Sequence, residues 1–185
     1  MDPRRVVKVS KFLSRHLRHD PDGLGLELDR GGWVAVDELL AACAARGVAL
    51  SRAELEEVVA RNDKRRFALD PDGDRIRARQ GHSVQVDLGL VPQEPPPRLF
   101  HGTGAGRVEA ILRDGLRPMG RRHVHLSPDA ATARWVGARH GRPEVLEVAA
   151  GDLGAAGHVF LRSDNGVWLT DRVPPWALKV VPAPR

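Results

Sequence analysis

The chain has 185 residues, 42% of them hydrophobic and 29% charged, so it can bury one large core or two small ones and should be folded throughout. Its 29 Lys and Arg against 24 Asp and Glu give a formal charge of +5, which suits a polyanionic partner. The single cysteine, Cys43, excludes an internal disulfide and a zinc site of several cysteines. No apolar run approaches the ~20 residues of a membrane helix, and no signal peptide is evident, so we expect a cytoplasmic protein without membrane contact.

The first predicted element is a helix from Val6 to His19. Its apolar residues recur at the spacing of one face: Val6, Val9, Leu13 and Leu17. A set of cations falls within a narrow arc on the opposite face, with His19 beside it: Arg4, Lys8, Lys11, Arg15 and Arg18. A single arginine on such a face is more typical of surface charge than of catalysis. The almost wholly cationic surface is nevertheless the first indication of anion binding.

Short strands, two more helices and a hairpin are expected before residue 80. In chain order they are strands at Leu24–Leu28 and Trp33–Val36, a helix from the N-cap Asp37 to Arg46–Gly47, a helix opened by the Ser51–Glu54 capping box and ending near Asn62, and strands at Phe67–Leu69 and Ile76–Ala78 around the turn from Asp70 to Asp74. Three helices and a hairpin indicate a winged helix. We expect this lobe to span residues 1–92 and to bind nucleic acid or another protein.

A Pro-rich stretch, residues 93–98, predicts a stiff connector to a second lobe, residues 99–185. The strands expected there are Leu99–His101, His123–Leu126, Val145–Val148, His158–Leu161, Val167–Thr170 and Leu178–Val181, with short helices near Val108–Leu112 and Ala130–Val136. The second lobe is therefore predicted to be strand-rich, and the whole chain to have the α+β class.

Two histidine-containing segments of the second lobe carry candidate ligands. His123 and His125 are two apart in a predicted strand, so they point the same way and can either bind zinc or line a ligand cleft as donors. No third ligand stands at a familiar spacing, so we expect no metal. His101-Gly102-Thr103 ends a strand, where Gly102 lets backbone approach a ligand closely and the flanking side chains supply donors and acceptors.

Taken together and in order, several motifs resemble the tRNA 2'-phosphotransferase family. They are Ser10-Lys11 through Leu17-Arg18-His19, Asn62-Asp63-Lys64 with Arg66-Phe67, Gln80-Gly81-His82-Ser83, His101-Gly102-Thr103, His123-Val124-His125-Leu126-Ser127, and Arg162-Ser163-Asp164-Asn165-Gly166-Val167 with Leu169-Thr170. The resemblance spans most of the chain. It implies an N-terminal winged-helix RNA lobe and a C-terminal NAD lobe of ADP-ribosyltransferase type.

The resemblance also implies site residues at matching positions. The implied catalytic set is Arg18, His19, Arg66 and Arg121, with Arg122 as the neighbouring alternative to the last. For NAD it implies His101, Gly102 and Thr103 around the nicotinamide ribose and carboxamide, His125 and Ser127 nearby, and Arg162, Ser163 and Asn165 toward the cofactor or the RNA 5' side. No Gly-x-Gly-x-x-Gly motif follows a strand, so NAD is expected to be a consumed substrate rather than a Rossmann-bound cofactor.

The family's reaction implies two steps. The RNA 2'-phosphate attacks the nicotinamide ribose C1'', nicotinamide leaves, and phospho-ADP-ribosylated RNA forms. The ribose 2''-OH then attacks phosphorus, which releases RNA with a free 2'-OH and ADP-ribose 1'',2''-cyclic phosphate. The first nucleophile is already an anion, so arginines need only hold it in line, whereas the second step moves protons, which His19 is expected to assist. The expected enzyme is a monomeric transferase of RNA processing, such as tRNA splicing, that acts on RNA with an internal 2'-phosphate.

Two other functions remain open at the level of sequence. An ADP-ribosyltransferase that modifies proteins or nucleobases would share the NAD lobe, but the chain has no tyrosine for a His-Tyr-Glu set and no Glu-x-Glu pair. A winged-helix DNA-binding regulator that senses NAD would need no such basic set, and it would be expected to carry a dimerisation helix, which is not evident.

Overall fold

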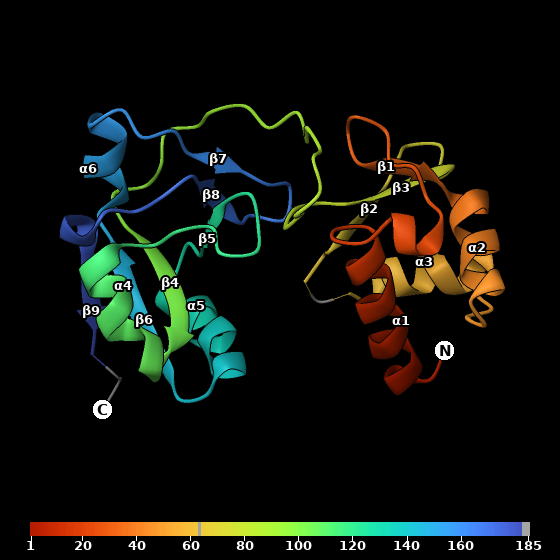
Figure 1. Cartoon of the computed structure of the whole chain (residues 1–185), viewed down its shortest axis with the longest axis horizontal. Coiled ribbons are helices and arrows are strands. Elements are labelled where there is room, and N and C mark those ends of the chain that lie inside the picture. Colours follow the sequence, from red (N-terminus) through yellow and green to blue (C-terminus); the bar gives the residue numbers. More distant parts are fainter. Residues whose placement is uncertain (63, 183–185) are drawn as a thin grey trace. The chain divides into compact units, whose positions relative to one another are not determined.

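The computed structural model describes residues 1–62 and 64–182 (Figure 1). It contains two compact units, Met1–Gly89 and Leu90–Arg185. Both combine short helices with small antiparallel sheets, so the predicted α+β class is confirmed. The winged-helix and ADP-ribosyltransferase-like descriptions of the lobes stay predictions.

The first unit places three helices against a three-stranded antiparallel sheet of strand order β1-β3-β2 (Figure 1). Its elements are α1 (Pro3–His16), η1 (Asp22–Leu24), β1 (Trp33–Ala35), α2 (Val36–Ala45), α3 (Arg52–Ala60), β2 (Phe67–Leu69) and β3 (Arg75–Ala78). Leu13, Leu39, Leu55 and Ile76 are fully buried at its core. Cys43 is buried there too, and burial raises the pKa of its thiol to about 11, so it packs as an apolar group.

Helix α1 is amphipathic as predicted, but it begins and ends earlier than its apolar pattern suggests. The Asp2 side chain caps its N-terminus by accepting from Arg5 N at 3.1 Å, and Pro3 occupies the first turn. The helix ends at His16, and Leu17 forms the C-cap. The prediction of a helix to His19 was wrong because Leu17 stays fully buried in the turn that follows, which continues the apolar spacing without helical backbone.

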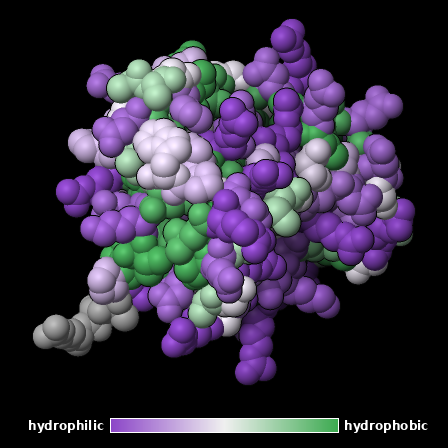
Figure 2. Space-filling view, turned by 60° about the vertical axis from the view of Figure 1, so that its left-hand side comes forward, coloured by the Kyte–Doolittle hydropathy of each residue, from purple (hydrophilic) through white to green (hydrophobic). Residues whose placement is uncertain are grey.

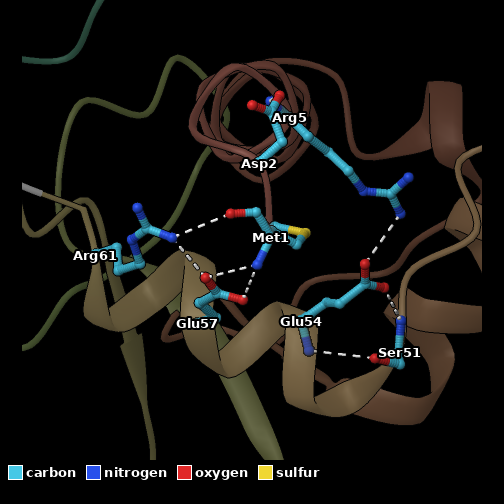
Figure 3. A network of polar contacts seen from close by, with 7 residues as sticks. All are labelled: Met1, Asp2, Arg5, Ser51, Glu54, Glu57 and Arg61. Atoms are coloured by element: carbon cyan, nitrogen blue, oxygen red, sulfur yellow. Dashed lines mark hydrogen bonds and ion pairs between the residues drawn. The ribbon is translucent and has the colours of Figure 1, made fainter.

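Polar contacts fix α1 on α3 (Figure 3). The Met1 amine donates to both carboxylate oxygens of Glu57, at 2.8 and 2.7 Å, and Arg61 Nη1 donates to Glu57 Oε1 at 2.6 Å and to the Met1 carbonyl at 3.2 Å. Arg5 Nη2 lies 3.3 Å from Glu54 Oε1. The hydrogen bonds from the Met1 amine and from Arg61 lower the pKa of the Glu57 carboxyl. The face of α1 that carries Arg5 is therefore the face that meets α3.

Two other expectations for the first unit need correction. Residues Leu24–Leu28 form no strand. Leu24 ends η1, the C-cap Gly25 has a left-handed φ of 71°, and Leu26 N donates back to the Pro21 carbonyl. Leu24 and Leu26 are buried, so their alternation reflects burial without strand pairing. Helix α2 begins at Val36, with Asp37 in its first turn rather than at the N-cap. The Ser51–Glu54 capping box of α3 is confirmed.

The second unit contains, among its described residues, two three-stranded antiparallel sheets of strand order β4-β6-β9 and β5-β8-β7. The elements are β4 (Leu99–Gly104), η2 (Ala105–Arg107), α4 (Val108–Asp114), β5 (Val124–Leu126), α5 (Ala130–Gly137), η3 (Ala138–His140), β6 (Pro143–Val148), α6 (Ala150–Ala155), β7 (Leu161–Arg162), β8 (Trp168–Thr170), η4 (Pro175–Ala177) and β9 (Leu178–Val181). A backbone bridge between Phe100 and Ser127 links the sheets, and α5 packs against β4 and β6. The strand expected at His158–Leu161 was wrong for its first three residues, since β7 begins only at Leu161.

Helix α6 was not expected, and it explains how the Pro-rich stretch is held. The Gly151 amide donates to the Pro97 carbonyl at 3.1 Å, and a Cβ on Gly154 would lie 3.1 Å from Pro95 Cγ. Gln93 N donates to Phe160 O at 2.8 Å. The glycines that bring α6 close to the prolines also lower its helix propensity, so its sequence does not predict a helix. Residues 93–98 thus have partners within the second unit.

The second unit also exposes apolar side chains on neighbouring elements. Leu112 of α4, Trp176 of η4 and Val180 of β9 are all exposed, and α4 contacts η4. Figure 2, which brings the left side of Figure 1 forward, shows hydrophobic residues gathered in one area among mostly hydrophilic ones.

None of the helices formed by residues 1–62 and 64–182 has the length and apolar character needed to cross a membrane.

Candidate functional site

The first unit carries three of the predicted catalytic residues, Arg18, His19 and Arg66, all outside regular helices and strands. Arg18 and His19 lie in the turn after α1. Arg18 is buried with 9% of its surface exposed, and its carbonyl accepts from Ser83 N at 2.9 Å and Val84 N at 3.3 Å. Its spacing in the sequence predicted that Arg18 belongs to the exposed cationic face of α1. That prediction was wrong, because the residue is buried after the helix ends.

His19 is exposed at the same turn and pairs with Ser83. Its Nδ1 lies 3.0 Å from Ser83 Oγ, and Ser83 Oγ also lies 3.5 Å from the Arg18 carbonyl, which can only accept. When the hydroxyl proton faces that carbonyl, the hydroxyl oxygen accepts from a protonated Nδ1. This arrangement favours the His19 tautomer that carries its proton on Nδ1 and leaves the lone pair on Nε2.

Arg66 is held by two buried polar side chains. Its Nη1 lies 3.3 Å from Ser10 Oγ and 3.3 Å from Asn62 Oδ1. Asn62 Nδ2 in turn donates to Ser10 Oγ at 2.7 Å, and both Ser10 and Asn62 are buried. Since Ser10 lies on α1 and Asn62 follows α3, the guanidinium is fixed where these two helices meet.

The loop from Asn62 to Arg66 has an unusual backbone. Arg65 has a φ of 42°, the one left-handed non-glycine residue among positions 1–62 and 64–182. Asn62 supports this turn because its carbonyl accepts from Arg65 N at 2.7 Å and its Oδ1 accepts from Lys64 N at 3.2 Å. Asp63 of the same motif lies outside the described residues.

One segment brings the two parts of this basic set together. Arg79 N donates to the Arg66 carbonyl at 2.9 Å, and four residues later Ser83 N donates to the Arg18 carbonyl. The chain after β3 therefore contacts both the Arg66 loop and the turn that holds Arg18 and His19. The first unit thus holds two arginines and an imidazole on backbone that one segment connects, and these residue types suit a phosphate.

In the second unit a chain of contacts joins three predicted residues. Arg121 Nη1 lies 3.0 Å from His125 Nδ1, and His101 Nδ1 lies 3.2 Å from the His125 carbonyl. Arginine only donates, so His125 Nδ1 accepts and its ring proton sits on Nε2. A carbonyl only accepts, so His101 carries its proton on Nδ1. Arg121 thus meets the His123-Val124-His125 segment directly.

Burial is the main cause that lowers the pKa of His101, with smaller contributions of the same sign from His140 and Arg121; its hydrogen bond to His125 acts in the opposite direction. His101 is therefore neutral near pH 7 and presents Nε2 as an acceptor. Burial, and next the charge of Arg139, lower the pKa of Arg121, but an arginine keeps its charge at neutral pH.

Gly102 has a packing role that its sequence context did not reveal. A Cβ at Gly102 would lie 1.7 Å from the Ala133 carbonyl oxygen of α5, and one at Gly137 would lie 2.9 Å from Thr103 N. The space expected for a ligand at this side of Gly102 is filled by the α5 backbone. Thr103 is buried with 4% of its surface exposed. Contact of either residue with NAD stays a prediction.

The remaining predicted cofactor residues lie in two places, Ser127 directly after β5 and the others on β7 and in the turn that follows it. Ser127 exchanges backbone hydrogen bonds with Phe100, at 2.7 and 2.9 Å. Ser163 Oγ lies 2.7 Å from Asn165 Oδ1 and 3.0 Å from the Val167 carbonyl, which closes a tight turn. Arg162 is exposed, stacks over Trp168 at 5.6 Å, and lines an open depression of about 450 Å³ with Glu94, Pro95, Pro96 and Pro128. Of this group, Arg162 is the residue most available to a ligand.

His123 and His125 have different surroundings, although both belong to the same motif. His123 Nε2 lies 4.0 Å from Asp171 Oδ1, whereas His125 pairs with Arg121. Burial lowers the pKa of His123, which the Asp171 carboxylate partly offsets. Within residues 1–62 and 64–182, no group of three or more His, Cys, Asp or Glu side chains could hold a metal ion.

Comparison with known proteins identifies the family. The model of the RNA 2'-phosphotransferase, Tpt1 / KptA family matches residues 4–172, which reach into both units. The chain belongs to this family. A probable RNA 2'-phosphotransferase of Herpetosiphon aurantiacus is 62% identical over 175 residues, covering 95% of this chain and 96% of that protein. One of Streptomyces coelicolor is 58% identical over 184 residues, covering 100% of both.

The structure adds three residues to those expected for a member of the RNA 2'-phosphotransferase family. Ser10, Asn62 and Ser83 hold Arg66 and His19, yet no role was expected for them from the residue pattern. Each stands in a motif that carries the family resemblance. Their presence in those motifs was the available signal, but the contact of Asn62 with Ser10 joins positions 52 residues apart, which local patterns do not predict.

Proposed function

We propose that this protein is an NAD-dependent RNA 2'-phosphotransferase. It removes an internal 2'-phosphate from RNA in the two steps given above, with NAD consumed and nicotinamide, RNA with a free 2'-OH and ADP-ribose 1'',2''-cyclic phosphate as products. The observation that carries this function is a set of basic side chains in the first unit, in a chain of this family. Arg66 is hydrogen-bonded to Ser10 and Asn62, and His19 is hydrogen-bonded to Ser83. The proposed lobes are a winged-helix RNA lobe at residues 1–92 and an ADP-ribosyltransferase-like NAD lobe at 99–185, joined by residues 93–98.

In the first step the arginines act on an anion that needs no activation. A 2'-phosphate oxygen forms the bond to C1'' as the bond to nicotinamide breaks and its electron pair leaves with nicotinamide. Arg66, whose Nη1 is fixed at 3.3 Å from both Ser10 and Asn62, keeps the phosphate in line without reorganising. We assign Arg18 to the same phosphate as a further cationic partner, and we propose Arg121 as a further catalytic arginine.

In the second step His19 moves a proton. The ribose 2''-OH must lose its proton as it attacks phosphorus, and the departing RNA 2'-oxygen must gain one. His19 is the member of the set whose residue type titrates near neutrality. With Nδ1 turned to Ser83 Oγ at 3.0 Å, its Nε2 is the atom that accepts from the 2''-OH and returns the proton. The arginines stabilise the charge that develops on the phosphoryl oxygens.

The second unit supplies groups that fit NAD. His101 offers an acceptor at Nε2, His125 a donor at Nε2, and Arg121 a charge, and the contacts through His125 link all three. Ribose hydroxyls and a pyrophosphate need this mixture of acceptor, donor and cation. Thr103, Ser127, Arg162 and Asn165 complete the proposed NAD-binding set, in which Gly102 allows the close packing of α5 and Ser163 closes its turn through Oγ.

The test is an assay of phosphate release from a short RNA that carries one internal 2'-phosphate, with and without NAD. The proposal expects loss of the phosphate only when NAD is present. The His19→Ala variant should accumulate phospho-ADP-ribosylated RNA, because the first step needs no proton transfer. Loss of the phosphate without NAD would overturn the proposed reaction, and a block of the first step in His19→Ala would overturn the role of His19.

A further inference from the structure

Helix α1 exposes a line of cations on the side away from the core. Arg4, Lys8, Lys11 and Arg15 are all exposed, whereas Val6, Val9 and Leu13 of the same helix are buried. At about 100° per residue the four cations fall within an arc of about 60°. With a rise of about 1.5 Å per residue the line extends about 16 Å along the helix axis. These four residues are called the α1 stripe below.

Among the described residues, three of the four cations in the α1 stripe lack ion pairs of the kind that Arg5 on the same helix makes. Arg5 points to α3, where it lies 3.3 Å from Glu54 and donates to the Ala49 carbonyl at 2.8 Å. In the stripe, Arg15 lies 3.7 Å from Asp20. Arg4, Lys8 and Lys11 make no ion pair or side-chain hydrogen bond with any residue in the ranges 1–62 and 64–182.

This arrangement opposes the stability of α1. Like charges three or four residues apart repel by a few tenths of a kcal/mol per pair. Arg4 also lies in the first turn of α1, where the helix dipole disfavours a cation and the N-cap Asp2 is the nearby acidic residue. The core contacts of α1 need none of the four charges. A polyanion laid along the helix would remove the repulsion by matching each cation with a phosphate.

We infer that the α1 stripe binds the phosphodiester backbone of RNA next to the 2'-phosphate. The inference rests on the proposed function for the identity of the reacting group. The stripe leads along α1 toward the turn with Arg18 and His19, which begins one residue after the helix ends at His16. A row of Lys and Arg without aromatic side chains between them is suited to phosphates rather than to a protein interface, whose core is depleted in lysine.

The experiment measures RNA affinity without NAD as a function of salt. The probe is a labelled single-stranded 12-nucleotide RNA that lacks a 2'-phosphate, and the variant is Lys8→Gln with Lys11→Gln. The slope of log K against log salt should shrink by about 1.4, which is about 0.7 for each phosphate that the variant no longer neutralises. Arg46→Gln removes one charge from the exposed C-cap of α2 in the same unit and should leave the slope unchanged.

An unchanged slope in the double variant, or an equal loss per charge in Arg46→Gln, would overturn the inference. The inference would also be overturned if binding of a poly-glutamate peptide lost as much affinity in the double variant as binding of RNA does. In the NAD-dependent assay the double variant should raise KM for a long 2'-phosphorylated RNA and leave kcat unchanged. If RNA binding depends on Lys8 and Lys11 but the wild-type protein transfers no phosphate, the proposed function is overturned and RNA binding by the stripe is supported.

Discussion

The two units hold their candidate site residues by different means. In the first unit Arg18, His19 and Arg66 lie in turns and loops, and buried or hydrogen-bonded side chains such as Asn62 and Ser83 fix them. In the second unit the residues lie on or beside strands. There His101 binds a backbone carbonyl, Ser127 pairs through its backbone, and Gly102 is backed by α5.

This difference sets what each site can tolerate. A site held by polar side chains fails when one hydroxyl or amide is lost, because its partners remain buried without their hydrogen bonds. A site held by backbone pairing and close packing tolerates such losses but not added volume. The first unit should therefore be sensitive to polar truncation, and the second to a methyl group placed where a glycine meets a helix.

The largest effect is expected for Gly102→Ala. The added Cβ would lie 1.7 Å from the Ala133 carbonyl oxygen, a backbone atom that can move only if α5 shifts. We expect a loss of about 3 kcal/mol of stability, at the upper end for an overpacked site. Urea denaturation measures the loss, and hydrogen exchange should increase at α5 but not at α1.

Gly106→Ala is the matched control, because a Cβ there meets nothing within 4 Å. It should change stability by less than about 0.5 kcal/mol. Equal losses in the two variants would contradict the packing role of Gly102.

Next in size is Asn62→Ala in the first unit. The change removes the 2.7 Å hydrogen bond to Ser10 and the acceptor of Arg66 and Lys64. We expect a loss of about 2 kcal/mol, the cost of stranding buried polar groups, and weaker phosphate transfer. Asn62→Asp keeps the Oδ1 acceptor and should retain more activity than Asn62→Ala. If the two variants lose activity equally, the acceptor does not position Arg66.

A smaller effect is expected for Ser83→Ala. Loss of one hydrogen bond of about 1 kcal/mol should slow the second step about 2- to 10-fold by freeing the His19 tautomer. The ¹⁵N chemical shifts of His19 report the tautomer directly, and Ser83→Thr should restore both the tautomer and the rate. A wild-type tautomer in Ser83→Ala would show that Ser83 does not orient His19.

The smallest effect is a pH dependence of stability in the second unit. Burial lowers the folded pKa of His101 below its unfolded value of about 6.5, so the unfolded state takes up the proton first as pH falls. The contribution is fully present above that unfolded pKa and is lost as pH falls through the folded pKa. As the pH is lowered from about 8 to about 5, the urea concentration at the unfolding midpoint should fall less steeply for His101→Gln than for the wild type. Parallel curves would assign the decline to other groups, among them His123, whose pKa is also lowered.

Regular elements of the first unit were largely predictable because their signals are local. The buried face of α1, the Ser51–Glu54 capping box and the hairpin at Phe67–Leu69 and Ile76–Ala78 all follow from neighbouring residues. The end of α1 was not predictable, since Leu17 is as deeply buried in the turn as it would be in a helix.

The candidate site was predictable only as a set of residue types. The hydrogen bonds that hold it span long distances in the sequence: His19 and Ser83 are 64 residues apart, and Arg66 and Ser10 are 56 apart. Gly102 shows the same limit, since its sequence indicates close approach but not whether a ligand or α5 approaches. Motifs located these residues, whereas packing decided what each one does.

The most direct test of the central claim is a product balance for the wild-type protein with 2'-phosphorylated RNA and NAD. The account predicts equal amounts of nicotinamide, RNA with a free 2'-OH and ADP-ribose 1'',2''-cyclic phosphate. Nicotinamide released with ADP-ribose while the RNA keeps its 2'-phosphate would contradict it and indicate an NAD hydrolase or an ADP-ribosyltransferase.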